Sequence, residues 1–121
     1  MKKERKNKKI VVEKPWGKFE QFTLNERSSV KILTANPGQR LSYQSHEKRE
    51  EFWRCIKGEV EVVINDIKYL LKEGDEIYIP KKAKHRLVGT EKQGQVLEIS
   101  FGFFDEDDIK RHEDDYGRIE S

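Results

Sequence analysis

The sequence predicts an all-β protein built as a closed or nearly closed sandwich or barrel. Three observations favour this fold class: short runs of alternating Val, Ile and aromatic residues, turn residues between these runs at regular spacing, and no stretch with helical periodicity. A length of 121 residues fits one domain with its own hydrophobic core. We therefore expect any function to reside in a single β fold.

The chain enters this fold through a turn. Pro15 disfavours helix and Gly17 permits a turn, so we expect Trp16 to act as a packing anchor before the first strand. Short β-prone runs bounded by turn residues then follow one another along the chain. The expected strands lie at residues 19–24, 29–36, 41–46, 52–57, 60–64, 67–71, 76–80, 84–89 and 96–101.

The C-terminal segment departs from the β pattern. Between residues 106 and 116, acidic residues precede Ile109, Lys110 and Arg111. This order suits the N-terminus of a helix followed by a basic later turn. We therefore expect a short C-terminal helical segment whose aspartates are solvated.

The charge distribution predicts a leader and one domain. Residues 1–14 carry seven Lys or Arg and two Glu, whereas the whole chain has a net charge of only +2. We expect residues 1–13 to be a basic, disordered leader and residues 14–121 to be a single domain. The leader has no interleaved aromatic residues, so a nucleic-acid partner is not expected.

Composition also predicts the compartment. Cys55 is the one cysteine, so an intrachain disulfide cannot form and a reducing cytoplasm is expected. No segment approaches the roughly 20 apolar residues of a membrane helix, and no apolar run follows the basic start as in a signal peptide. We expect no membrane partner.

Four polar residues on expected strands predict a metal site. Gln44 and His46 are two apart, so both project to one face of a strand, and Glu51 can rejoin that face after a charged turn. His85 begins a later strand and is the fourth candidate ligand. Two imidazoles, a carboxylate and an amide oxygen suit one divalent ion, with Zn²⁺ favoured and Fe²⁺, Mn²⁺, Ni²⁺ or Co²⁺ as alternatives.

Several motifs then occur in the order found in a known family. The stretches PGQRLSYQSHEKREEFW and IYIPKKAKHRL resemble the two sequence motifs of the cupin superfamily. With KPWG at the start and DEDDIKRHEDDYGR at the end, residues 14–118 look like the cupin domain of type II mannose-6-phosphate isomerases. In that family the domain is usually the C-terminal part of a bifunctional enzyme that also carries a mannose-1-phosphate guanylyltransferase. The resemblance implies a double-stranded β-helix, a jelly-roll-like barrel, with metal ligation by Gln44, His46, Glu51 and His85.

The same resemblance implies a function. We expect a metal-dependent isomerase, standing alone, that interconverts mannose 6-phosphate and fructose 6-phosphate, with the cation polarising the carbonyl. Arg40, Arg86 and Arg118 are the candidates for binding the phosphate of this sugar-phosphate partner. Glu98 is the candidate catalytic base, because a late strand places it on its less apolar face.

Departures from the family pattern support an alternative. The histidine that usually follows the ligand glutamate is Phe52 here, which favours a non-catalytic, metal-binding cupin that binds a sugar or nucleotide-sugar and assists a partner. An iron oxygenase on the same ligand set is a third possibility. We also expect a homodimer, with Phe52, Ile56 and Phe103-Phe104 at the interface.

Overall fold

The computed structural model describes residues 9–118, and this part of the chain forms eleven β-strands and no helix. Accordingly, it contains no helix long and apolar enough to cross a membrane. The strands are β1 (Ile10–Lys14), β2 (Gly17–Gln21), β3 (Ser28–Ala35), β4 (Tyr43–Ser45), β5 (Arg49–Lys57), β6 (Glu59–Ile64), β7 (Ile67–Lys72), β8 (Glu76–Ile79), β9 (His85–Gly89), β10 (Gly94–Gly102) and β11 (Lys110–Glu113).

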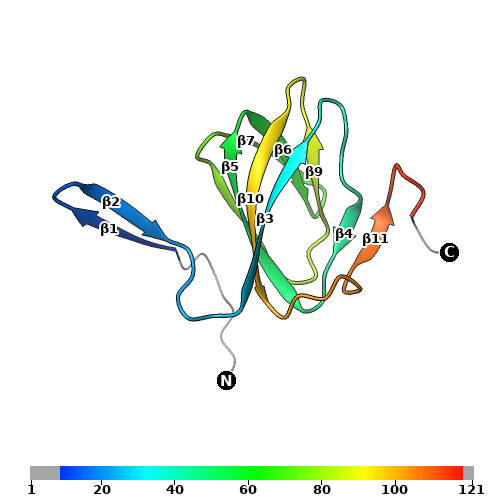
Figure 1. Ribbon diagram of the computed structural model, residues 1–121. Helices are drawn as coiled ribbons and strands as arrows, with labels where there is room; N and C mark the ends of the chain where they lie inside the picture. The colour runs from blue at the N-terminus through cyan, green and yellow to red at the C-terminus, as the bar shows by residue number, and fades with distance from the viewer. Residues whose placement is uncertain (1–8, 119–121) are drawn as a thin grey trace.

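Two antiparallel sheets form the barrel. One has the strand order β3-β10-β5-β8 and the other the order β11-β4-β9-β6-β7. Strands close in space are far apart in sequence, as in the pairing of β3 with β10, so the sheets are built by crossovers. The sheets face each other, and β1 and β2 form a separate hairpin that projects from the barrel (Figure 1). The expected all-β class is confirmed.

The core lies between the two sheets because inward positions alternate along the strands. On β5, Glu51, Trp53 and Cys55 are buried, as the period of two predicts. An apolar cluster fills one half of the interior with side chains from both sheets. Its buried members are Ala35, Trp53, Cys55, Val60, Val62, Leu71, Ile79, Ala83, Leu87 and Val96.

Strand β5 begins earlier than the charged sequence suggested. We expected a turn up to Glu51, but Arg49 and Glu50 are already in the strand and are buried. Each has a partner that compensates for burial: Arg49 donates to Glu51, and Glu50 accepts a hydrogen bond of 2.6 Å from Tyr78. Paired charges are tolerated in a strand interior where lone ones are not.

The expected C-terminal helical segment is a strand. Within the segment, Lys110 pairs with Ser45 and Arg111 pairs with Gln44, so β11 adds an edge strand next to β4. A short isolated helix has little stability of its own, whereas an open sheet edge offers backbone hydrogen-bond partners. Tertiary pairing therefore outweighs the local charge order.

Part of the expected leader is also a strand. Strand β1 begins at Ile10 and pairs with β2, so residues 10–13 belong to the hairpin, while residues 1–8 lie outside the described residues. Lys9 lies 2.7 Å from Glu20 and 2.9 Å from Glu76, and these ion pairs tether the hairpin to β8. Trp16 lies at the hairpin turn and is 72% exposed, so it is not the packing anchor we expected.

Phe52 is not free for the interface predicted for it. It lies on the outer face of its sheet, packed with Ile99 and Phe101 in a small cluster, and the ring of Phe22 covers it at 5.5 Å between centroids. Phe103 and Ile56 are exposed at 54% and 39%. The segment before β3 therefore occupies the surface around Phe52.

Candidate metal centre

Three buried side chains from three strand regions converge inside the barrel. His46 follows β4, Glu51 lies on β5 and His85 begins β9. One ligand atom from each lies within 4.8 Å of the others. Nε2 of His46 is 3.6 Å from Oε2 of Glu51, and Nε2 of His85 is 3.4 Å from Oε1. The structure thus brings three of the four predicted ligand residues together.

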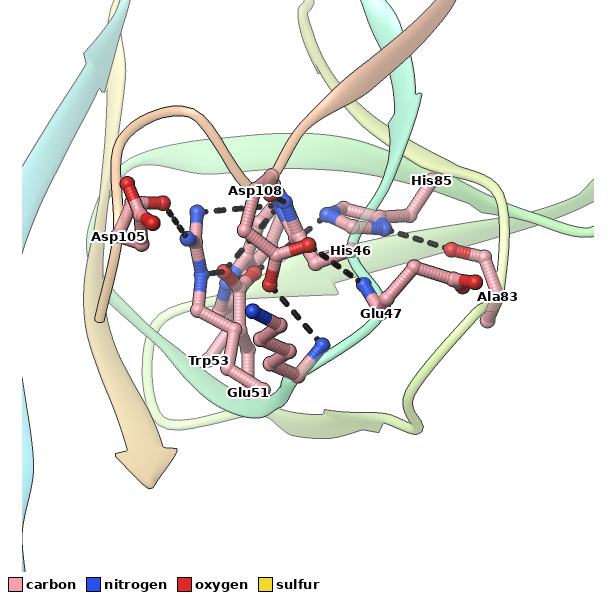
Figure 2. A network of polar contacts seen from close by, with 10 residues as sticks. His46, Glu47, Glu51, Trp53, Ala83, His85, Asp105 and Asp108 are labelled. Carbon is pink, nitrogen blue, oxygen red and sulfur yellow. Dashed lines mark hydrogen bonds and ion pairs between the residues drawn. The ribbon is translucent and has the colours of Figure 1, made fainter. Parts of the chain in front are cut away.

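Hydrogen bonds behind the rings fix which imidazole nitrogen faces the centre. Nδ1 of His46 lies 2.6 Å from the carbonyl oxygen of Asp108, and Nδ1 of His85 lies 3.0 Å from that of Ala83 (Figure 2). A carbonyl only accepts, so each Nδ1 carries a proton, and in the neutral form of each ring Nε2 presents a lone pair. The Nε2 atoms of both rings therefore face the Glu51 carboxylate, which is the arrangement of metal-ligating histidines.

The protonation states of these groups suit a cation. Burial lowers the pKa of His46, which keeps the ring neutral near pH 7. Burial alone would raise the pKa of Glu51, but His85, His46 and the permanently charged Arg49 outweigh it and lower this pKa to about 2. Nε2 of His85 is buried without a hydrogen-bond partner among the described residues. Two imidazole nitrogens and a carboxylate directed at one point are a donor set that fits a divalent metal ion.

Trp53 and Arg49 hold the carboxylate in place. The indole Nε1 of Trp53 donates to Oε1 of Glu51 at 3.1 Å, and Nε of Arg49 donates to Oε2 at 3.2 Å. Nη2 of Arg49 also lies 3.2 Å from Nε2 of His46, and its guanidinium stacks on Phe104 at 4.4 Å. Arg49 thus places a positive charge beside two of the three ligand residues.

Asp108 is a supporting residue that sequence reasoning missed. Its carboxylate accepts from the backbone N–H groups of Glu47 and Lys48 at 2.9 Å each, while its carbonyl accepts from His46 (Figure 2). Although burial opposes it, these backbone hydrogen bonds lower the pKa of Asp108. We expected this aspartate to be solvated, and nothing local could reveal a contact across 62 positions of the chain.

A cavity of about 780 Å³ opens from this centre. Gln44, the fourth candidate ligand, lines it and lies opposite His85 in the pairing of β4 with β9. Glu98 lines it as well, on β10 beside Trp53. Burial first, and then the negative charge of Glu51, raise the pKa of Glu98 to about 7. A carboxyl group of that pKa can donate or accept a proton near neutral pH.

The three predicted phosphate-binding arginines separate in space. Arg118 lines the cavity and pairs with Asp114 at 2.8 Å. Arg40 pairs with Asp115 at 2.7 Å and lines a different hollow. Arg86 follows His85 and so points to the outer face of its sheet, where it binds Glu113 at 3.0 Å and lies over the Tyr43 ring. The structure therefore does not bring Arg40 and Arg86 to this cavity.

Comparison with known proteins identifies the family. Residues 1–114 match the family described as "Mannose-6-phosphate isomerase C-terminal". The chain belongs to this family. It is 41% identical over 113 residues to the mannose-1-phosphate guanylyltransferase ManC of Salmonella typhimurium, covering 89% of this chain and 23% of that protein. It is 39% identical over 109 residues to the alginate biosynthesis protein AlgA of Pseudomonas aeruginosa, covering 88% and 23%.

Solved structures support the fold. A Cupin 2 conserved barrel domain protein from Salinispora arenicola matches with a TM-score of 0.58 and 24% identity, covering 65% of this chain and 66% of that one. The capsular polysaccharide assembling protein CapF of Staphylococcus aureus matches with a TM-score of 0.65 and 18% identity, covering 87% and 34%. At this level of identity the likeness shows the fold alone, and it confirms the cupin barrel.

The expectation of an isomerase that stands alone is wrong. The chain spans about a quarter of the length of the curated relatives it matches, and these relatives are named as guanylyltransferases and polysaccharide biosynthesis proteins. A match of this extent fits a cupin domain of the kind present in longer enzymes. The sequence motifs identified the domain correctly but could not show what accompanies it.

Proposed function

We propose that this chain is a metal-binding cupin domain that binds a sugar phosphate beside the metal and serves a mannose-1-phosphate guanylyltransferase in supplying polysaccharide precursors. The observation that carries the metal site is the convergence of two imidazole lone pairs on the Glu51 carboxylate. The identity of about 40% with guanylyltransferases and with alginate biosynthesis proteins supports the biosynthetic setting. We keep a cytoplasmic location and Zn²⁺ as the preferred ion within this proposal.

The residues at the site have separate roles. His46, Glu51, His85 and Gln44 would hold the ion, which when bound supplies positive charge that polarises an oxygen of the sugar. Glu98 faces the same cavity and is the group that would exchange a proton with bound sugar. The closed apolar half of the barrel excludes water from behind the ligands.

Metal titration of the chelator-treated chain tests the proposal. Calorimetry with Zn²⁺, Mn²⁺, Co²⁺, Ni²⁺ and Fe²⁺ should show one ion bound per chain, and Glu51→Gln should weaken binding more than 100-fold, beyond the 10–100-fold typical of outer-shell partners. Glu50→Gln is the matched control, because Glu50 is also buried but faces Tyr78 on the other side of β5. Failure of the wild-type chain to bind any of these ions, or wild-type affinity in Glu51→Gln, would refute the metal site.

We also propose a homodimer. Exposed apolar residues on the outer face of β3, Val30 at 59% and Ile32 at 58%, support it. Light scattering coupled to size exclusion should give twice the 14.4 kDa chain mass. A mass of one chain at micromolar concentration would exclude this part of the proposal.

A further inference from the structure

One arginine that was not among the predicted phosphate-binding residues points into the cavity. Arg111 lies on β11, directly opposite Gln44 on β4. Directly paired residues of an antiparallel sheet project to the same face, and both residues line the cavity. Arg111 therefore faces the same space as His46 and Glu51.

The guanidinium of Arg111 has donors without acceptors. Its Nε is buried and has no hydrogen-bond partner, and the structure records no ion pair from this side chain to any residue between 9 and 118. A guanidinium presents five N–H donors in a planar fork, and a buried donor left unmet is costly. Such an arrangement indicates that the partner is a ligand.

Four other arginines differ in charge compensation. Each has a carboxylate partner that already neutralises it: Glu51 for Arg49, Asp115 for Arg40, Glu113 for Arg86 and Asp114 for Arg118. Nη2 of Arg86 also lacks a hydrogen-bond partner among the described residues, but Arg86 lies on the outer face of its sheet and does not line this cavity. An arginine held by a carboxylate gains little from a second anion, because it must share its donors. Arg111 keeps its full positive charge and its N–H donors available for an anionic ligand.

The chemistry around Arg111 suits a phosphate. Two further cationic side chains, Lys110 and Lys31, line the same cavity, together with the carboxyl groups of Glu98, Glu106 and Asp107. A guanidinium is the group among these that binds phosphate oxygens in a bidentate manner. A volume of about 780 Å³ is within the usual range of small-molecule sites. The metal ligands form the other functional part of the lining, so one ligand can meet both.

We infer that Arg111 anchors the phosphate of the bound sugar phosphate, with the sugar facing the metal ligands. This inference rests on the proposed function, since it names the residue that selects phosphorylated over free sugar. It replaces Arg40 and Arg86, which the structure places elsewhere, as the main phosphate contact.

Calorimetric titration of the metal-loaded full chain with mannose 6-phosphate, mannose 1-phosphate, inorganic phosphate and mannose tests the inference. Arg111→Gln should weaken binding of the three phosphates at least tenfold and leave the affinity for mannose unchanged. Arg111→Lys keeps the positive charge but loses the planar guanidinium, so its affinity for the phosphates should lie between those of the wild type and Arg111→Gln. Arg40→Gln is the matched control and should stay within twofold of wild type.

The outcomes separate this inference from the proposed function. Wild-type phosphate affinity in Arg111→Gln, or an equal loss in Arg40→Gln, overturns the role of Arg111 while the metal site stands. Absence of any phosphate or sugar-phosphate binding by the wild-type chain overturns the inference together with the sugar-phosphate part of the proposed function, and the metal titration decides the remainder.

A measurement on the unchanged protein covers the case in which the variants do not fold. In ¹⁵N-labelled wild-type chain, the Arg111 Nε–H resonance should shift on addition of inorganic phosphate, while the Arg40 Nε–H resonance should not. An Arg111 resonance that stays in place while phosphate binds overturns the inference.

Discussion

The interior of the barrel has two halves that are built by the same strands. On β9, His85 faces the charged half and Leu87 the apolar half, and on β10 Glu98 and Val96 divide in the same way. Each pair is two residues apart and points inward. On each strand, one inward position therefore lies in the cavity and the next inward position lies in the closed core.

The two halves differ in what stabilises their side chains. In the apolar half, contacts between side chains from both sheets provide stability. In the charged half, Trp53 and Arg49 donate hydrogen bonds to Glu51. His46 donates to the carbonyl oxygen of Asp108, and its other ring nitrogen remains directed at the same point as the Glu51 carboxylate. The apolar half therefore stabilises the fold, whereas the charged half keeps polar groups available to a ligand, and four changes test this division.

The largest loss of stability is expected in the apolar half. Leu87 is 1% exposed, so Leu87→Ala should lower the free energy of unfolding by about 2–5 kcal/mol, through lost burial and a residual cavity. Urea denaturation measures this as a lower midpoint at constant slope. Leu70→Ala, at a site that is 54% exposed, is the control and should change little. A neutral Leu87→Ala would mean that this half is not the source of stability.

The charged half should stabilise the protein only through its ligand. Zn²⁺ at a free concentration of 1,000 times its dissociation constant should raise the free energy of unfolding by about 4 kcal/mol, because it binds the folded state alone. His85→Ala should abolish the rise in melting temperature that Zn²⁺ causes. His112→Ala is its control, since His112 bonds Ser45 outside the cavity. Equal stabilisation of both variants by Zn²⁺ would contradict the division.

Glu98 predicts a pH dependence in the metal-free protein. Folding raises its pKa from 4.5 to about 7, so its protonated form favours the folded state at low pH, and this contribution is lost as the pH rises from about 4.5 through about 7. Glu98→Gln cannot ionise, so it should gain stability over wild type by on the order of 3 kcal/mol across that window.

The readout is the difference between the Glu98→Gln and wild-type unfolding free energies at each pH. Folding lowers the pKa of His46, so its contribution to stability rises with pH, opposite to that of Glu98. Both proteins contain His46, so this contribution cancels in the difference. Parallel pH curves for the two proteins would show that Glu98 does not titrate as a buried group.

The smallest effect is expected at the rim, outside both halves. Arg40 and Asp115 form an ion pair in which both side chains are 43% exposed, so Asp115→Asn should lower the melting temperature only slightly. The melting temperatures of the variant and the wild type should converge at high salt, because salt screens such pairs. A fall in melting temperature as large as that of Leu87→Ala would show that the rim belongs to the stabilising core.

Local patterning predicted much of the fold. Alternation and turn residues located the nine strands from β2 to β10, and the inward set of Glu51, Trp53 and Cys55 followed from the period of two. It missed β1, whose apolar residues Ile10, Val11 and Val12 lie within the expected basic leader. It also missed β11, where charged residues form a strand because β4 is available as a pairing partner. Pairing partners are a property of the whole chain, so no local pattern contains them.

The candidate site shows the same limit. Sequence spacing brought His46, Glu51 and His85 together correctly, because strand periodicity and motif order are encoded locally. It could not exclude Arg40 and Arg86 or find Asp108 and Arg111, because register and long-range packing decide whether a side chain enters the cavity.

Alternation along the strands is enough to predict a β barrel in which His46, Glu51 and His85 face inward. Three-dimensional packing decides which charges are neutralised and which remain available to a ligand. An arginine beside a carboxylate and an arginine without one are the same residue in the sequence, and three-dimensional pairing distinguishes them. That pairing left Arg111 facing the metal centre with its donors unmet.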